Sequence, residues 1–132
     1  MINNLIQYLR DQFPTYLFVK RLDPPDKQAC IVVRSAGGVP TGYPMQRVDE
    51  LVQIICRSQD RTEAESRASE IYFFLKEKFD FDLPSVPALS LDAVTIAKFH
   101  ASQVPGDFSQ EGTGVYQFLV NFVAIYSDVP VT

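Results

Sequence analysis

Residues 115–126 read Val-Tyr-Gln-Phe-Leu-Val-Asn-Phe-Val-Ala-Ile-Tyr, and this apolar stretch decides the fold. Because side chains alternate between the two faces of a strand, one face carries Tyr116, Phe118, Val120, Phe122, Ala124 and Tyr126. The opposite face is also largely apolar and carries Val115, Leu119, Val123 and Ile125. A strand with two apolar faces is expected either in the centre of a sheet beneath helices or buried against another subunit.

The segments before it predict four more strands. Residues 94–104 alternate in the same way and are expected to form a hairpin with the last strand, with a long tip between them. Gln46–Arg57 predicts a strand with one apolar and one mixed face. Two short apolar runs, Tyr16–Leu22 and Ala29–Arg34, flank a Pro-rich turn and are expected to pair as another hairpin. Ser35–Pro44 contains three Gly and two Pro, which predicts a long exposed loop.

Two segments have helical periodicity. Apolar residues spaced three and four apart predict a helix over Asn4–Phe13, capped by Asn3 or Asn4 and ended by Pro14. A second helix is expected to begin at a capping box, Asp60 with Glu63 or Thr62 with Glu65. Its apolar stripe comprises Ala64, Ala68, Ile71, Tyr72, Leu75 and Phe79, so the helix is expected to run through about Phe79. Phe73 lies roughly 200° from Ile71 around this helix and therefore needs another partner.

These elements predict the order α-β-β-β-α-β-β, which is an α+β fold with two helices and a mainly antiparallel sheet. With 132 residues, the chain has the size of one domain, residues 1–132. Sixteen acidic residues against twelve Lys and Arg give a net charge of −4, without a basic block, which disfavours a dedicated nucleic-acid binder. Apolar runs are too short to cross a membrane, and nothing resembles an export signal, so a cytoplasmic compartment is expected.

The sequence carries no enzyme motif, metal-ligand spacing or phosphate-binding loop. His100 is interpreted as a polar strand residue, and the Asp80–Asp82 pair as a solvated helix exit. Cys30 and Cys56 lie in apolar segments and are expected to be small buried side chains rather than a disulfide or a nucleophile. Gly37-Gly38 lacks a following helix that would help it to hold phosphate. Three arginines, Arg57, Arg61 and Arg67, stand among acids and are expected to form surface ion pairs.

The chain resembles the tail-terminator, or tail-completion, proteins of long-tailed bacteriophages, several of which are catalogued as minor capsid proteins. The likeness lies in the order of short patterns over nearly the whole chain. These are an amphipathic first helix, Ser35-Ala36-Gly37-Gly38, Ile54-Ile55-Cys56-Arg57-Ser58-Gln59-Asp60, Glu63-Ala64-Glu65, Gln103-Val104-Pro105, a loop with Glu111-Gly112 and Gly114, and an aromatic strand with Asn121-Phe122.

The resemblance implies a structural virion protein that forms a hexameric ring at the head-proximal end of the tail tube, assembled in the host cytoplasm. Its implied partners are other copies of itself, the tail tube protein, a neck or connector protein and a tail sheath protein. DNA would pass through the ring without specific binding, and no membrane, cofactor, metal or catalysis is implied. Ring closure needs a heterologous contact between different patches of neighbouring subunits. The residues expected at these contacts are Gly37, Gly38, Val39, Tyr43, Phe73, Phe108, Glu111 and Val115.

Three other functions fit the same sequence. A neck or head-completion protein would bind on the portal side instead of the tube end. A small α+β enzyme would use His100 with Asp80, Asp82 or a cysteine. A host-derived adaptor would dimerise through an open sheet edge.

Overall fold

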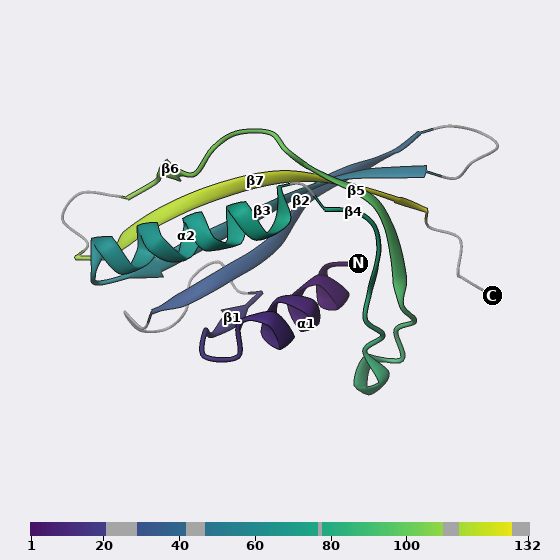
Figure 1. The fold of residues 1–132 in the computed structure, drawn as a ribbon, viewed down its shortest axis with the longest axis horizontal. Helices are drawn as coiled ribbons and strands as arrows, with labels where there is room; N and C mark the ends of the chain where they lie inside the picture. The colour runs from purple at the N-terminus through teal and green to yellow at the C-terminus, as the bar shows by residue number, and fades with distance from the viewer. Residues whose placement is uncertain (21–28, 42–46, 77, 110–113, 128–132) are drawn as a thin grey trace.

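The apolar stretch at the end of the chain forms β7 (Tyr116–Ser127), an inner strand of a sheet with the order β1-β2-β3-β7-β5-β4. The computed structural model describes residues 1–20, 29–41, 47–76, 78–109 and 114–127, and Figure 1 shows their arrangement. The other elements are α1 (Ile2–Gln12), β1 (Phe18–Val19), β2 (Cys30–Thr41), β3 (Arg47–Ser58), α2 (Arg61–Leu75), β4 (Phe79–Leu83), the 3₁₀ helix η1 (Pro87–Leu89), β5 (Val94–Ala101) and β6 (Gly106–Asp107). The predicted α+β class with two helices is confirmed, and β4 and β6 add to the predicted order.

Antiparallel pairing dominates the sheet. β3 pairs with β7 without interruption from Arg47–Ser127 to Ser58–Tyr116, and on its other side it pairs with β2. β7 then pairs with β5 and, nearer its beginning, with the short β6, so the predicted pairing of the last two long segments is confirmed. The predicted hairpin between the first two strands is wrong, because β1 runs parallel to β2. Two apolar runs around a turn do not by themselves fix the direction in which strands pair.

The described part of the glycine-rich segment, residues 35–41, is a strand rather than the predicted loop, and residues 42–44 of that prediction lie outside the described residues. β2 continues through Gly37, Gly38 and Val39 to Thr41, in register with Val48 and its neighbours on β3. The register shifts between Ser35 and Gly38, and Gly37 there has φ +105°. A bulge takes up the extra residue, and glycine reaches this left-handed backbone conformation at little cost. Glycine therefore marks an irregularity within the strand instead of its end.

Both helices differ from the prediction at their ends. Met1 occupies the N-cap of α1 without a side-chain cap, so neither Asn3 nor Asn4 caps it. Asp60 caps α2 as predicted, and its side chain accepts a hydrogen bond from the Thr62 N–H at 3.0 Å. However, α2 ends at Leu75, and Phe79 begins strand β4 instead of completing the helix.

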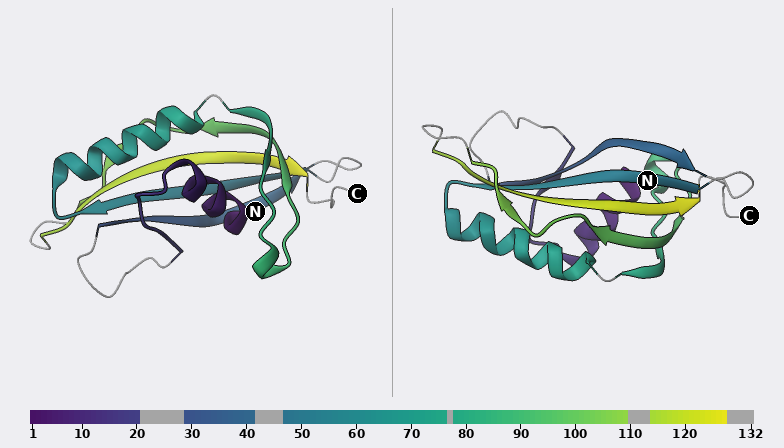
Figure 2. Two further views of the ribbon diagram at one scale, coloured as in Figure 1. Left: turned by 60° about the horizontal axis from the view of Figure 1, so that its bottom comes forward. Right: turned by 90° about the horizontal axis from the view of Figure 1, so that it is seen from above.

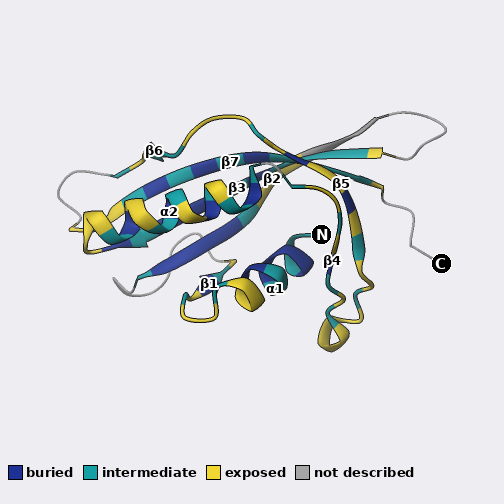
Figure 3. Ribbon diagram, in the orientation of Figure 1, coloured by how far each residue is buried: buried dark blue, intermediate teal, exposed yellow. Residues whose placement is uncertain are grey.

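α1 and α2 pack on the same face of the sheet. One continuous hydrophobic cluster joins buried residues of both helices to residues of β1, β2, β3, β4, β5 and β7. Its sheet members are Phe18, Ile31, Val33, Val52, Ile54, Cys56, Leu83, Ile96, Phe99, Phe118, Val120, Phe122 and Ala124. The alternation of buried and partly exposed residues along β7 is visible in Figure 3, and Figure 2 shows α2 lying along one side of the strands. The helices thus cover one of the two apolar faces.

Aromatic rings join both helices to the outer strands of the sheet. Tyr8 of α1 stacks on Phe74 of α2 with 5.6 Å between ring centres and lies 5.5 Å from Phe81 of β4. The Lys78 ammonium group lies 4.4 Å from the centre of the Phe74 ring, a cation–π distance that keeps the charge at the surface of the cluster. This packing explains why the chain leaves α2 early, since β4 must bring Phe81 beneath these rings.

Asn4 is the buried polar residue that ties α1 to the rest of the molecule. Its Nδ2 donates hydrogen bonds to the Pro84 and Asp92 carbonyl oxygens, both at 2.9 Å, in the chain on either side of η1. We expect Asn4→Ala to lower the free energy of unfolding by about 2 kcal/mol, because it leaves two carbonyl groups without their donor. Urea unfolding followed by circular dichroism measures this loss.

Asn3→Ala is the matched control for this substitution. Asn3 is the neighbouring residue on the same helix and is only partly buried. Its side chain makes no hydrogen bond to another described residue. The control should change the stability by less than about 0.5 kcal/mol. Equal losses for Asn3→Ala and Asn4→Ala would contradict the role assigned to Asn4.

Candidate interaction surface

Several large apolar side chains of the described residues are exposed. They are Leu17, Phe73, Phe79, Leu89, Val104, Phe108 and Tyr116. Phe73 is 65% exposed although it lies within α2, because it projects away from the sheet, as its place off the apolar stripe predicted. Its ring contacts Tyr72, with 5.2 Å between centres, and the Lys76 ammonium group lies 4.8 Å from its centre. Phe73 is thus an apolar protrusion on the outer side of the helix layer.

The second face of the sheet is the other candidate surface. We call it the open sheet face and define it by the partly exposed residues Arg34, Leu51, Gln53, Arg57, Leu119, Asn121, Val123 and Ile125, with the exposed Lys98 and His100 beside them. One end of this face is not open, because a smaller hydrophobic cluster of Cys30, Val32 and Ile55 there is buried within the subunit. No helix among the described residues packs on this face, so β7 lies beneath helices on one side only.

Cationic and polar groups on this face lack full pairing. Arg34 Nε donates to Gln53 Oε1 at 2.7 Å, but Arg57 Nε and Nη1 and Asn121 Oδ1 are buried without a hydrogen-bond partner in the described part of the chain. None of the ion pairs among the described residues involves Arg34, Arg57 or Lys98. An unpaired buried donor costs free energy until a partner supplies an acceptor. The open sheet face therefore combines apolar area with unneutralised positive charge.

The residues predicted at subunit contacts do not gather in one place. Gly37, Gly38 and Val39 lie on β2 toward the Arg47 end of β3, whereas Phe108 pairs through its backbone with Gln117 near the opposite end. Figure 1 shows these two ends at opposite extremes of the long axis. Val115 is buried within the subunit. Tyr43 and Glu111 lie outside the described residues.

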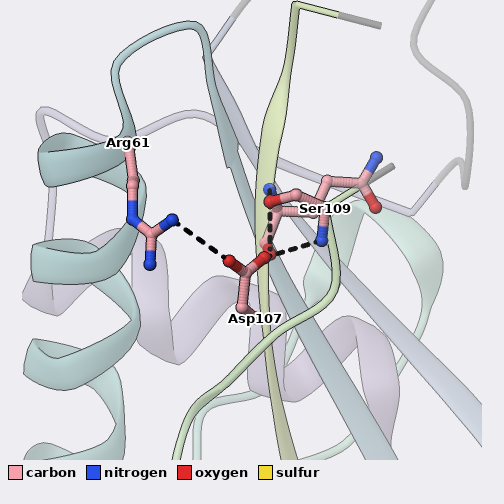
Figure 4. A network of polar contacts seen from close by, with 4 residues as sticks. Arg61, Asp107 and Ser109 are labelled. Carbon is pink, nitrogen blue, oxygen red and sulfur yellow. Dashed lines mark hydrogen bonds and ion pairs between the residues drawn. The ribbon is translucent and has the colours of Figure 1, made fainter. Parts of the chain in front are cut away.

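A polar network fixes β6 between β7 and the first turn of α2 (Figure 4). Asp107 Oδ1 accepts the Ser109 N–H at 2.8 Å, and Asp107 Oδ2 lies 3.4 Å from Arg61 Nη1. The Ser109 hydroxyl oxygen in turn accepts the Gln117 N–H of β7 at 2.9 Å. Hydrogen bonds from Ser109, helped by the Arg61 charge, hold the pKa of Asp107 below its usual range. The network positions the exposed Phe108 next to β7.

The cysteines, the histidine and the aspartates that could serve in catalysis lie apart from one another. Cys30 and Cys56 are buried free thiols in separate hydrophobic clusters, as small buried side chains were expected to be, and burial raises the pKa of Cys56 to about 12. His100 is exposed and lies opposite Val123 on the open sheet face. Asp80 and Asp82 are exposed on β4 rather than at a helix exit, and Asp82 accepts a hydrogen bond from the Thr95 hydroxyl at 2.7 Å.

The predicted surface ion pairs are confirmed for two of the three arginines. Arg61 pairs with Asp107, and Arg67 pairs with Glu63 at 3.1 Å while its guanidinium lies 4.3 Å from the centre of the Tyr16 ring. Arg57 is the exception, because it turns to the open sheet face and forms no ion pair with a described residue. Sequence reasoning missed this, since the acids that follow Arg57 along the chain lie beyond the end of its strand.

A scan against models of protein families finds no match, and no curated protein matches the chain. Within the described part of the chain, no group of three or more His, Cys, Asp or Glu is placed to hold a metal ion. None of the described helices has the length and apolar character to span a bilayer.

The attachment of β6 should depend on the charge of Asp107. Because the folded state lowers this pKa, the stabilisation is present above the unfolded value of about 3.9 and is lost as the pH falls through the folded value. We expect Asp107→Asn to speed hydrogen exchange of the Ser109 and Phe108 amides at neutral pH, as measured by NMR. Acidification of the unmodified protein should reduce the difference between the two chains.

Asp80→Asn is the control, since Asp80 is an exposed carboxylate on β4, away from this network. It should leave the exchange of both amides unchanged. Unchanged exchange in Asp107→Asn would show that β6 is held by its backbone pairing alone.

Proposed function

We propose that this chain is the subunit of a ring that caps the head-proximal end of a bacteriophage tail tube and stops its growth. The ring is a homo-oligomer, a hexamer by the family resemblance, with the tube protein on one side and neck or connector proteins, and a sheath protein where there is one, around it. The proposal places the protein in the virion, after assembly in the host cytoplasm. No cofactor, membrane or enzymatic step is part of it.

The observation that carries the proposal is the half-covered sheet. Helices bury one face of β7, while Leu119, Val123 and Ile125 on the other face remain partly exposed. The open sheet face is one apolar surface of the subunit, and the outer side of α2 with the exposed Phe73 is another. Phe108 is exposed as well. A protein that binds copies of itself head to tail needs two different patches of this kind, and sixfold repetition then closes a ring.

The net negative charge of the chain is consistent with the passage of DNA through the proposed ring. A net charge of −4 does not favour binding to phosphates, so DNA would slide through the ring without sticking. The open sheet face is the local exception to the acidic character, and in a ring it would face a neighbouring subunit rather than the lumen.

Binding to preformed tail tubes tests the proposal. We expect the purified chain, mixed with tubes, to decorate one end of each tube in negative-stain electron micrographs. Tubes treated in this way should no longer lengthen when free tube protein is added, because the capped end no longer offers a surface for the next tube subunit. Untreated tubes in the same solution serve as the control for growth.

Two results would contradict the proposal. Uniform binding along the tube would show an affinity for tube protein without recognition of its end. Binding to isolated portal complexes but not to tubes would instead assign the chain to the neck or head-completion proteins.

A further inference from the structure

We propose that the ring contact is formed when the outer side of α2 in one subunit packs on the open sheet face of the next subunit. This inference rests on the proposed function, since it takes the partner to be a second copy of the chain. The two surfaces are different parts of the molecule, so the contact is heterologous and can repeat around a closed ring. It also makes each sheet a layer between the two helices of its own chain and one helix of its neighbour.

The outer side of α2 has the shape that such packing requires. Thr62, Ser66, Ser69 and Phe73 follow one another at helical spacings of four, three and four residues, which places them on one stripe. The three small residues allow a close approach of the helix axis, and the 65% exposed Phe73 supplies an apolar anchor at the end of the stripe. Exposed Glu65 lies beside the stripe and has no ion pair among the described residues.

The open sheet face complements this stripe in charge. Arg34, Arg57 and Lys98 carry positive charge there. Asp49 of β3, which lies on the same face opposite Ile125, already pairs with Arg47 at 2.7 Å. This is a local positive excess on a chain whose net charge is −4. Lys98 is exposed and Arg34 is partly exposed, so a carboxylate such as Glu65 of a neighbouring copy would pair with these two cations. Arg57 Nε and Nη1 are buried within the subunit and lie out of its reach.

Apolar residues decide between a protein and a nucleic acid as the occupant. Leu51, Leu119, Val123 and Ile125 form rows between the cationic residues, so the face offers apolar area that phosphates would leave unused. A phosphate backbone is bound by a series of cations, and three on this face is a short series. A helix with one anchor aromatic and a flanking acid matches both features, in the same way that α2 packs on its own sheet.

Cross-linking between two single-cysteine variants tests the contact. Ser66→Cys places a thiol on the outer side of α2, and Val123→Cys places one on the open sheet face. We expect a short bismaleimide to link the two chains into dimers when they are mixed, and to give little product with either variant alone. Native Cys30 and Cys56 contribute little background because both are buried. Ser66→Cys mixed with Ser85→Cys, an exposed serine between β4 and η1, is the control pair.

Each alternative occupant gives a different result. Dimers from Ser66→Cys alone would show an isologous helix–helix contact and would overturn the proposal. Absence of linked dimers, both free and on tubes, would do the same. Duplex DNA that binds the native chain, and binds Arg34→Glu with Lys98→Glu at least tenfold more weakly, would assign the open sheet face to nucleic acid and also overturn it.

Substitution of Phe73 gives a second measurement with a closely matched control. Phe73→Ser should reduce self-association, measured by sedimentation at high protein concentration or on tubes, at least tenfold, because it removes the anchor. Phe79→Ser removes an equally exposed ring, 69% against 65%, from β4 and should leave association unchanged. Equal effects of the two substitutions would contradict a specific role for α2.

The two proposals fail separately. A chain that caps tubes but gives no Ser66–Val123 cross-link overturns the helix-on-sheet contact and leaves the terminator function in place. A chain that gives the cross-link without capping tubes supports the contact and contradicts the terminator function.

Discussion

The burial of β7 is the constraint on which the rest of the structure depends. A strand with apolar side chains on both faces must be covered twice, and the described helices cover it once. Phe118, Val120 and Phe122 are buried beneath α2 and the aromatic residues beside it, whereas Leu119 and Val123 are left partly exposed. Because exposed apolar surface of this kind favours association, the uncovered side of β7 is the part of the sheet that the proposed ring contact would use.

Sequence patterns predict the structural features that depend on residues close together in the chain. The α+β class, the existence of both helices, the Asp60 cap and the outward position of Phe73 all follow from spacings of two, three or four residues. Each of these features is decided by neighbours close in sequence, whose side chains share a face whatever the rest of the fold does.

Features set by distant parts of the chain are the ones that sequence reasoning missed. The parallel direction of β1 depends on where α1 packs, and the end of α2 depends on the aromatic cluster that Phe81 joins from β4. Asn4 looks like a helix cap in the sequence, but its amide meets carbonyl groups some 80 residues later. Arg57 has acids nearby in sequence and none beside it on its sheet face, so its unpaired state is visible only in three dimensions.

The bulge at Gly37 has a consequence for how this chain can diverge. A side-chain carbon added at Gly37 would meet no atom within 4 Å, so the space around the residue is open. Its φ of +105° nevertheless excludes most other residues. Substitution at position 37 is therefore limited by backbone torsion rather than by volume, and a residue other than glycine there is expected to change the twist of β2 as well.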